Sequence, residues 1–517
     1  MSSSSCSNSI PQPTEHRLAP DSLAASIFVL LAVSVIQRSV GFGRGVLFCR
    51  WLVPEELGQW DMAYSFLLLA APLIVLGLPG SFGRYLERYR QRQQLRTFLK
   101  RTAAWTAAFT GAAIGIIALW TPSFSWLVFG RSDRKSLVML MAGSLVAVIT
   151  HHFLEALFAA LRKFRIVSMM QFCQSICFAV ISLSLLWWWQ LSAESIVIGY
   201  GAACFISAVG ALILTGRSIA EVASPGPALA HREFWPPLVR FAVWVWFTNL
   251  LCNLFAVVDR YMLVHWSGMT PDEALTQVGY YHSSRVVPLL LISLADMLAG
   301  IAMPYLSHDW ELGHRKQVSD RLNLILKLTA IGMLAASVLI LLGAPLLFHL
   351  AFEGRYNEGL AVLPWTLAYC VWYAILIVAQ NYIWCAEKTK LGSVPLGIGL
   401  VVNILLNIVL IPLWGLYGAV FATTLSTGLA LGLLYWLNHR EGMEIHAGLV
   451  WLTFSPIALG GGAWLGAAVL LIILLAAPFS RWLFTDDERA MLGSYLRQHL
   501  DTATSLLLRQ PKQAKAT

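Results

Sequence analysis

Charged residues are scarce in this sequence. Only 12% of its 517 residues are Asp, Glu, Lys or Arg, and 58% are hydrophobic, whereas a soluble globular chain has about 25% charged residues. At about 20 residues per membrane-spanning helix, the apolar residues are enough for about twelve to fourteen spans. This composition excludes a soluble enzyme, a disordered protein and a single-span receptor, and it leaves almost no chain for a soluble catalytic domain.

The residue patterns of metal, cofactor and catalytic sites are also missing. Cys173 and Cys177 are one helical turn apart, but no histidine or acid converges on them, and two thiols alone make a poor metal site. The glycine-rich stretch 41–45 follows no predicted strand, so it does not fit a dinucleotide-binding loop. We therefore expect no metal, no cofactor and no enzymatic activity.

Basic residues outnumber acidic ones, and their positions indicate an orientation in the membrane. The formal net charge is +9, but the basic residues form short clusters between apolar runs, which argues against nucleic-acid binding. If the N-terminus is placed in the cytosol, the cytosolic loops contain 18 Lys and Arg residues and the outer loops contain 5. Because Lys and Arg accumulate in the cytosolic loops of membrane proteins, we predict a cytosolic N-terminus.

Twelve long apolar runs predict twelve membrane-spanning helices. Their ranges are 23–49, 60–83, 103–121, 136–160, 167–190, 195–215, 237–265, 278–303, 322–348, 359–385, 391–413 and 416–437. The next apolar region, 447–484, is long for one helix and short for two. After it, Thr485 to Glu488 form a capping-box pattern and apolar residues recur on one helical stripe, which predicts an amphipathic tail on a membrane surface or a partner.

Two stretches of the chain resemble each other and suggest an internal repeat. The stretches 160–215 and 386–437 each begin with a short basic turn, followed by a span, a tight turn and a second span rich in small residues. The repeat predicts an all-α fold of two parallel six-helix bundles with a substrate site between them; a chance likeness of two apolar hairpins is the alternative. The predicted segments are a cytosolic tail (1–22), an N-terminal bundle (23–215), a cytosolic linker (216–236), a C-terminal bundle (237–437), one or two extra transmembrane helices (438–484) and an amphipathic tail (485–517).

Arginines inside the spans are the first candidate functional residues, since a charge at membrane depth usually faces a cavity or a partner. The predicted cationic, substrate-binding set lies on spans one, seven and eight and consists of Arg38, Arg44, Arg260 and Arg285. Guanidinium groups bind phosphate through two parallel hydrogen bonds and keep their charge at any physiological pH, so they indicate an anionic substrate. The alternative is that these side chains extend to the membrane interface.

A second set of intramembrane residues is a candidate for coupling transport to an ion or for lining a cavity. It consists of His151, His152, Glu155, Asn249, Asn253, Asp259, His282 and Asp296. The histidines and the glutamate on span four lack the HExxH order of a zinc protease, so we expect packing or proton coupling there rather than a metal. Asparagines within spans, including Asn403 and Asn407, are typical of hydrogen bonds between helices.

Several motifs resemble those of one transporter superfamily. The stretch 50–58, Arg-Trp-Leu-Val-Pro-Glu-Glu-Leu-Gly, resembles the signature that ends the first span of polysaccharide flippases. The stretch 77–85 is similar to their glycine-rich end of span two, 259–263 and 278–281 resemble their elements in spans seven and eight, and 403–419 resembles their span-eleven hairpin. The sequence is therefore identified as a member of the multidrug/oligosaccharidyl-lipid/polysaccharide (MOP) exporter superfamily, from motifs in both halves.

The resemblance implies a V-shaped, MATE-like pair of six-helix bundles around a central cationic cavity. It implies a flippase that carries an undecaprenyl-pyrophosphate-linked oligosaccharide to the outer leaflet of a bacterial inner membrane by alternating access, for O-antigen, lipopolysaccharide or exopolysaccharide biosynthesis. Its partners would be this lipid-linked substrate, the bilayer and a polysaccharide polymerase or export machinery. By the same resemblance, Arg38 or Arg44 and Arg285 correspond to cationic residues of related lipid flippases.

Two other functions stay open. A cation-coupled drug or small-molecule antiporter of the same fold would favour acidic residues in the cavity, and its acidic first-span residue is missing here. A glycan polymerase or ligase would have one sizeable outer loop, whereas the longest outer loop expected here has about a dozen residues.

Overall fold

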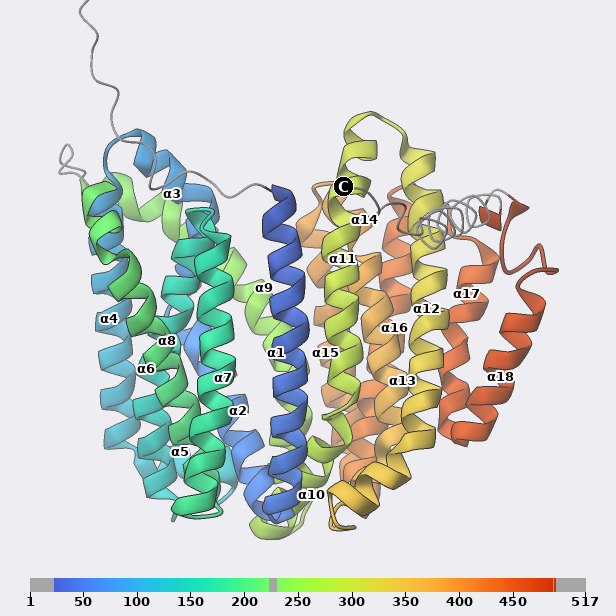
Figure 1. Ribbon diagram of the computed structural model, residues 1–517, viewed down its shortest axis with the longest axis horizontal. Helices are drawn as coiled ribbons and strands as arrows, with labels where there is room; N and C mark the ends of the chain where they lie inside the picture. The colour runs from blue at the N-terminus through green and yellow to red at the C-terminus, as the bar shows by residue number, and fades with distance from the viewer. Residues whose placement is uncertain (1–22, 223–229, 487, 490–517) are drawn as a thin grey trace, which may run out of the picture. The chain divides into compact units, whose positions relative to one another are not determined.

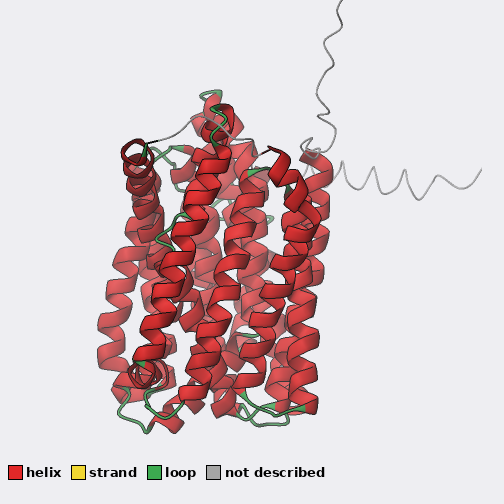
Figure 2. Cartoon of the chain, turned by 90° about the vertical axis from the view of Figure 1, so that its left-hand side faces the viewer, coloured by secondary structure: helices red, strands yellow, loops and turns green. Residues whose placement is uncertain are grey.

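The computed structural model describes residues 23–222, 230–486 and 488–489, and every regular element within these residues is a helix (Figure 1 and Figure 2). Among the described residues, eleven helices are long and apolar enough to cross a membrane. The prediction of an all-α, multi-pass membrane protein is confirmed. The tail 1–22 and most of the predicted amphipathic tail, from residue 490 onward, lie outside the described residues.

Each of the twelve predicted spans overlaps a helix. In the first half these helices are α1 (Leu23–Trp51), α2 (Pro54–Ile74), α4 (Leu95–Leu119), α6 (Lys135–Ala160), α7 (Phe164–Trp188) and α8 (Ala193–Val222). In the second half they are α9 (His231–Trp266), α11 (Pro288–Glu311), α12 (Arg315–Leu346), α13 (Asn357–Ala379), α15 (Thr389–Trp414) and α16 (Leu416–Arg440). Shorter helices extend or connect them: α3 (Phe82–Gln91), α5 (Thr121–Phe129), α10 (Pro271–Arg285) and α14 (Asn381–Cys385).

The predicted spans 60–83 and 278–303 are interrupted. The run 60–83 is helical as α2 only to Ile74, because the chain then turns through Leu76 and Gly77, which both have positive φ. A methyl group at Gly77 would lie 2.7 Å from the Ala242 carbonyl oxygen, so the turn needs glycine for the close approach of α9 as well as for its φ. The run 278–303 breaks between α10 and α11, directly before Pro288. Val286 and Val287 keep helical dihedral angles, but Pro288 has no backbone N–H to donate to the preceding turn, so the helical hydrogen bonds are interrupted there.

The ambiguous region 447–484 contains two short helical segments. The first is α17 (Ala447–Phe454), which continues as a 3₁₀ turn over Ser455–Gly461, and the second is α18 (Ala463–Ala476). Gly462, with φ 92°, separates them. Both segments are apolar but shorter than the eleven spans, so the region is a helical hairpin rather than one long span.

The predicted capping box at the start of the tail is present. The Glu488 N–H donates to the Thr485 hydroxyl at 3.3 Å, and the Thr485 N–H donates to the Glu488 carboxylate at 2.8 Å. The same carboxylate receives the buried Lys327 ammonium at 2.7 Å and lies 3.1 Å from Nδ1 of His446. Burial opposes the charged form of Glu488, but its hydrogen bonds with His446 and Lys327 lower its pKa to about 2. The ion pair between Lys327 and Glu488 anchors the end of the described chain to α12.

The chain divides into two compact units. Unit 1 contains the residues up to Arg44 and residues 63–250, and unit 2 contains residues 45–62 and the residues from Leu251 onward. The chain therefore passes from one unit to the other inside α1, inside α2 and inside α9. In particular, the first turns of α2 belong to unit 2 although the rest of that helix belongs to unit 1.

Five helix ends share one type of turn, and the turn recurs at matching places in the two halves. After α3, α6, α11, α14 and α16 the chain passes through a residue of positive φ, namely Gln93, Arg162, Gly313, Glu387 and Gly442. In each turn the next N–H donates to the carbonyl five residues back, as Lys163 does to Phe158 at 2.9 Å, which is the Schellman cap. The stretches 160–215 and 386–437 both start on this turn and continue into packed hairpins, α7–α8 and α15–α16.

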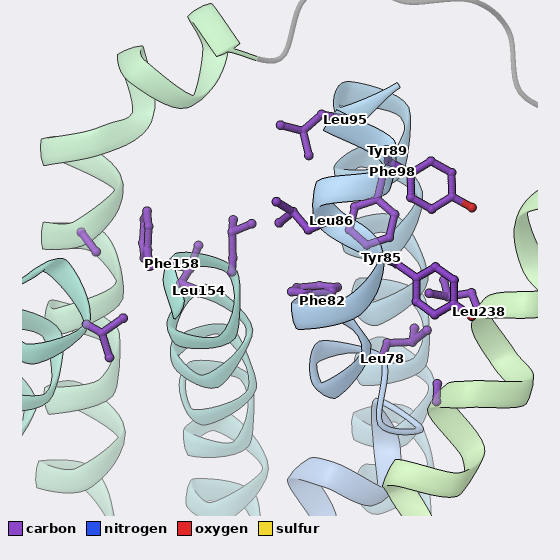
Figure 3. Close-up of a cluster of buried hydrophobic side chains, with 14 of the residues drawn as sticks. Leu78, Phe82, Tyr85, Leu86, Tyr89, Leu95, Phe98, Leu154, Phe158 and Leu238 are labelled. Carbon is purple, nitrogen blue, oxygen red and sulfur yellow. The ribbon is translucent and has the colours of Figure 1, made fainter. Parts of the chain in front are cut away.

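Aromatic side chains hold α3 to the rest of unit 1. Tyr85 and Tyr89 of α3 are buried, and the Tyr89 ring stacks on Phe98 of α4 with 5.1 Å between ring centroids (Figure 3). Phe234 of α9 contacts both of those rings, at 5.6 and 6.0 Å, and the Tyr85 hydroxyl donates to the Pro237 carbonyl at 3.0 Å. One face of this short helix is therefore fixed inside the protein, and the opposite face is left outward.

Candidate functional site

A carboxylate from the start of α2 lies among the basic residues of unit 2. Gly58 of α2 and Gly279 of α10 allow the two helices to cross at backbone contact: a methyl group on either glycine would lie 1.9 Å from a carbonyl oxygen of the other helix. The crossing places Asp61, only 3% exposed, beside α9 and α10. Its carboxylate lies 2.8 Å from Nε of Arg260 and 2.9 Å from Nδ1 of His282.

Asp259, the neighbour of Arg260 on α9, is held by a separate set of neutral groups. Its carboxylate accepts hydrogen bonds from the Asn407 amide at 2.8 Å, from the Tyr281 hydroxyl at 3.3 Å and from the Thr423 hydroxyl. These donors come from α15, α10 and α16. Asn403, one turn before Asn407 on α15, donates to the Thr423 and Ser426 hydroxyls of α16 at 3.3 and 3.4 Å, so the asparagines of span eleven do form the hydrogen bonds between helices that their positions predict.

Two consecutive residues of α9 thus carry opposite charges toward different neighbouring helices. Side chains at adjacent helical positions point about 100° apart, so Asp259 faces α15 and α16 while Arg260 faces α2. The formal charges of Asp61 and Asp259 balance those of Arg260 and Arg285. A buried charge is costly unless it is paired or hydrogen-bonded: Asp61 is paired with Arg260, and Asp259 is stabilised by hydrogen bonds from neutral donors.

Arg285 forms no ion pair with an acidic side chain among the described residues. Its guanidinium lies 5.3 Å from the centre of the Tyr281 ring and interacts with Asp61 at longer range and with the Tyr369 hydroxyl. Its Nε is buried and has no hydrogen-bond partner among the described atoms. A buried donor without a partner is uncommon in folded proteins, so Arg285 retains a donor that an anionic group can satisfy.

Arg44 occupies a different environment, inside unit 1. Its guanidinium stacks on the Phe178 ring at 4.0 Å, a favourable cation–π contact. The Tyr200 ring lies 5.1 Å from Phe178 and 5.7 Å from Tyr64, so the cation sits at one end of an aromatic row. Arg38, on the same helix, is half-buried.

The candidate residues of α6 differ in how exposed they are. His151 is buried, with 4% of its surface exposed, whereas His152 is exposed. Glu155 lies 3.2 Å from Nδ1 of His152 and accepts a hydrogen bond from the Gln171 amide of α7 at 2.6 Å. Glu155 therefore links α6 to α7 inside unit 1.

Three other candidates are exposed or only partly buried. Asn249 is exposed and belongs to unit 1, Asn253 is half-buried, and Asp296 is exposed on α11. Because the helix breaks after Arg285, the shared face that the sequence assigned to Arg285 and Asp296 does not continue as one helical surface.

Oxygen-bearing residues near Asp259 could also hold a cation. The carboxylate, the Asn407 side-chain oxygen (buried and without a hydrogen-bond partner among the described atoms) and the Thr423 hydroxyl are hard ligands of the kind that small cations prefer. Among the described residues one other group, Asp320, Glu444 and His446, has three ligand atoms within 4.8 Å of one another. Its histidine is already paired with Glu488, and we assign no metal to it.

Sequence reasoning missed Asp61. It is the sole charged residue of the predicted span 60–83, and that property is the signal that could have identified it. Tyr281 and Thr423 carried no comparable signal, because hydroxyls are frequent in these spans. Their role depends on where α10 and α16 pack against α9.

The fold places the chain in a class of membrane protein. The lipid II flippase MurJ in an inward closed conformation has a similar structure, with a TM-score of 0.67 and 14% identity over 87% of this chain and 99% of that one. An outward-facing multidrug resistance MATE family transporter of the MOP superfamily is similar with a TM-score of 0.57 and 11% identity, over 83% and 95%. The chain therefore has the two-bundle fold of these MOP proteins, as the motifs predict.

Within that class, the chain belongs to the family described as polysaccharide biosynthesis protein, which matches residues 23–310. The uncharacterized membrane protein YabM of Bacillus subtilis (strain 168) is 26% identical over 263 residues, 50% of this chain and 46% of that protein. The lipid II flippase MurJ of the same organism is 23% identical over 265 residues, 46% of this chain and 47% of that protein. The chain spans about half the length of the curated relatives it matches.

Proposed function

We propose that this protein is a flippase for an undecaprenyl-pyrophosphate-linked oligosaccharide. It carries this cargo from the cytosolic to the outer leaflet of a bacterial inner membrane during the biosynthesis of a surface polysaccharide, upstream of a polymerase or export machinery. Membership of the polysaccharide biosynthesis family and a fold similar to that of a lipid II flippase support this function over an enzymatic one. No bond is made or broken, and two bundles alternate in exposing the cargo to either side.

The observation that carries the proposal is the buried, unsatisfied Nε of Arg285 within a charged network of unit 2. A pyrophosphate group offers several anionic oxygens, and a guanidinium binds such oxygens with directional hydrogen bonds. Arg260 shares its charge with Asp61, so in this proposal it positions the network rather than binding cargo directly. Arg38 and Arg44 supply further positive charge from unit 1.

The oxygen-rich surroundings of Asp259 suit a coupling role. Exchange of a proton or a small cation at a buried carboxylate changes the charge of the network by one unit. Since Arg260 is the next residue, that change acts on the Asp61 pair through the same helix. We assign ion coupling to Asp259 for this reason.

The test is a deletion strain complemented with variants. Mass analysis of its lipid-linked intermediates should show accumulation of the complete oligosaccharide on its lipid carrier and loss of the surface polysaccharide. Arg285→Gln should restore export poorly, at least tenfold below the unchanged gene, and Arg285→Lys should restore part of it. Arg355→Gln, a change at an exposed arginine of unit 2, is the matched control and should restore export fully. Normal export by the deletion strain without accumulated intermediate would refute the proposal.

One observation favours a second candidate, the cation-coupled antiporter. Two buried carboxylates, Asp61 and Asp259, lie in unit 2, and MATE transporters have a similar fold. An antiporter predicts that the deletion strain becomes sensitive to cationic dyes while its surface polysaccharide stays normal. The same strain therefore separates the two functions.

A further inference from the structure

A row of basic side chains covers the outward face of α3 and the first turns of α4. The exposed members are Arg84, Arg88, Arg90, Arg92, Arg96 and Lys100. One acid, Glu87, lies among them, 3.6 Å from Arg90, and Arg84 lies over the Phe241 ring at 5.0 Å. The other four have no acidic partner among the described side chains. We call these four residues, Arg88, Arg92, Arg96 and Lys100, the α3–α4 basic face.

The apolar side of α3 is buried by contacts within unit 1. Tyr85, Leu86 and Tyr89 are buried in the aromatic cluster shown in Figure 3. The helix is therefore fixed by its contacts with α4, α6 and α9, and its basic side is presented outward by a rigid support. Because the backbone of α3 is already fixed, binding does not have to order the helix itself, and only the side chains lose conformational freedom.

The second half of the chain provides an internal comparison. The turn between α11 and α12 has the same Schellman geometry as the turn between α3 and α4: His314 N–H donates to Asp309 at 3.0 Å, and Gln94 N–H donates to Tyr89 at 2.8 Å. In the second half the basic residues are balanced by acids: Arg315, Lys316 and Arg321 have Asp309, Glu311 and Asp320 beside them in the sequence, and Arg321 pairs with Asp309. The repeated geometry thus does not itself require an unbalanced basic face.

The position of the α3–α4 basic face, next to the start of the apolar run of α4, indicates which molecules it binds. The helix α4 is a candidate membrane span that begins at Leu95, and its uncharged apolar run begins after Arg101. Arg92, Arg96 and Lys100 therefore lie just before that run, at the level where lipid headgroups are expected. Guanidinium and ammonium groups at that level attract anionic lipid phosphates, and arginine in particular forms bidentate hydrogen bonds with phosphate. The charge complementarity is with the phosphodiester of an anionic phospholipid.

We propose that the α3–α4 basic face binds the phosphate groups of anionic phospholipids in the leaflet that meets this end of unit 1. The lipids hold α3 at the headgroup level from outside while the aromatic cluster holds it from inside. This role is independent of the cargo that the protein carries, since the face lies entirely within unit 1 and outside the network of Arg285.

The test compares two sets of four substitutions in the purified full-length chain. The first set is Arg88→Gln, Arg92→Gln, Arg96→Gln and Lys100→Gln. The control set is Arg315→Gln, Lys316→Gln, Lys388→Gln and Lys390→Gln, four exposed basic residues at two Schellman turns of unit 2. Binding of fluorescent phosphatidylglycerol and phosphatidylcholine is measured in detergent. A cation near anionic lipid contributes about fivefold in affinity, so the first set should weaken phosphatidylglycerol binding at least tenfold and the control set less than about threefold.

Three results would overturn the proposal. They are unchanged phosphatidylglycerol binding in the first set, an equal loss in the control set, and a loss confined to a short-chain prenyl pyrophosphate probe, which would assign the face to cargo. If the first set fails to fold, two further measurements keep the proposal testable. Arginine-to-lysine variants at the three arginines should retain most of the binding, and the unchanged protein should lose phosphatidylglycerol binding as salt is raised, because surface charges are screened.

Discussion

The pair formed by Asp61 and Arg260 gives a quantitative test of the buried network. Both side chains are 4% exposed and lie 2.8 Å apart, and Asp61 also contacts His282 at 2.9 Å. Asp61→Asn keeps the shape of the side chain but removes its charge. The substitution leaves the Arg260 guanidinium buried without a counter-ion, because the nearby Asp259 carboxylate is already engaged with Asn407 and other donors.

The expected cost follows from this burial. Removing one partner of a buried ion pair costs about 3–5 kcal/mol, because the remaining charge stays desolvated and unpaired. We therefore expect Asp61→Asn to lower the apparent unfolding temperature by on the order of 10 °C. The double variant Asp61→Asn with Arg260→Gln removes both charges, so it should be more stable than Asp61→Asn alone by about 2 kcal/mol or more.

The assay is thermal unfolding of the purified protein in detergent, followed by intrinsic tryptophan fluorescence. Glu353→Gln is the control, since Glu353 is about 42% exposed and pairs with the exposed Arg50 and Arg355, and such surface pairs contribute at most about 1 kcal/mol. An unfolding temperature for Asp61→Asn equal to that of the control would refute the reasoning. Strict additivity in the double variant would refute the pairing itself.

Three further outcomes follow from local geometry. Gly279→Leu should prevent stable folding, since its side chain would meet a backbone carbonyl, whereas Gly300→Leu on α11, with open space around it, should be tolerated; size-exclusion profiles distinguish them. Because the pKa of Glu488 is lowered to about 2 from 4.5, its stabilising charge is present above about pH 4.5 and is lost as the pH falls toward 2; Glu488→Gln should reduce this acid dependence of the unfolding temperature. Glu387→Gly should stabilise unit 2 by about 1 kcal/mol, because Glu387 has a φ of 56° that glycine adopts without strain, and Glu387→Val should destabilise it; both are measured by thermal unfolding.

The helices could be predicted from sequence because a membrane span needs a long apolar run, and such a run is a local property. The interruptions were harder to predict. The break after α10 depends on Pro288, which is visible in the sequence. The turn after α2 depends on how closely Gly77 packs against α9, and this packing is not visible in the sequence. The sequence did not decide whether 447–484 forms one helix or two, because its segments are shorter than ordinary spans. The close contact of Gly460 with Trp365 of α13 is a tertiary contact that the sequence does not show.

The ion pair of the buried charged network could not be predicted from the sequence. The sequence places Arg260 inside a predicted span, and a phosphate ligand was the natural expectation because its counter-ion, Asp61, lies 199 positions away in the sequence. Nothing local indicates that the first turns of α2 join unit 2. The pairing depends on two glycines at the crossing of α2 and α10, each of which alone is unremarkable in a membrane helix.

The two halves repeat their geometry but not their electrostatics. Both use the same Schellman turns and the same packed hairpins, yet unit 2 contains balanced charges buried around Asp259 and Arg260, whereas unit 1 has unbalanced cations on the outward face of α3 and α4. Helix packing depends on the shapes of side chains, so a repeat can keep its fold while its charges diverge. Buried charges respond strongly to each other because water does not screen them, whereas surface cations respond to lipid phosphates and to salt. Substitutions in the network should therefore change stability and coupling with little dependence on salt, and substitutions on the α3–α4 basic face should act through lipid and be masked by salt, so ionic strength separates the roles of the two units.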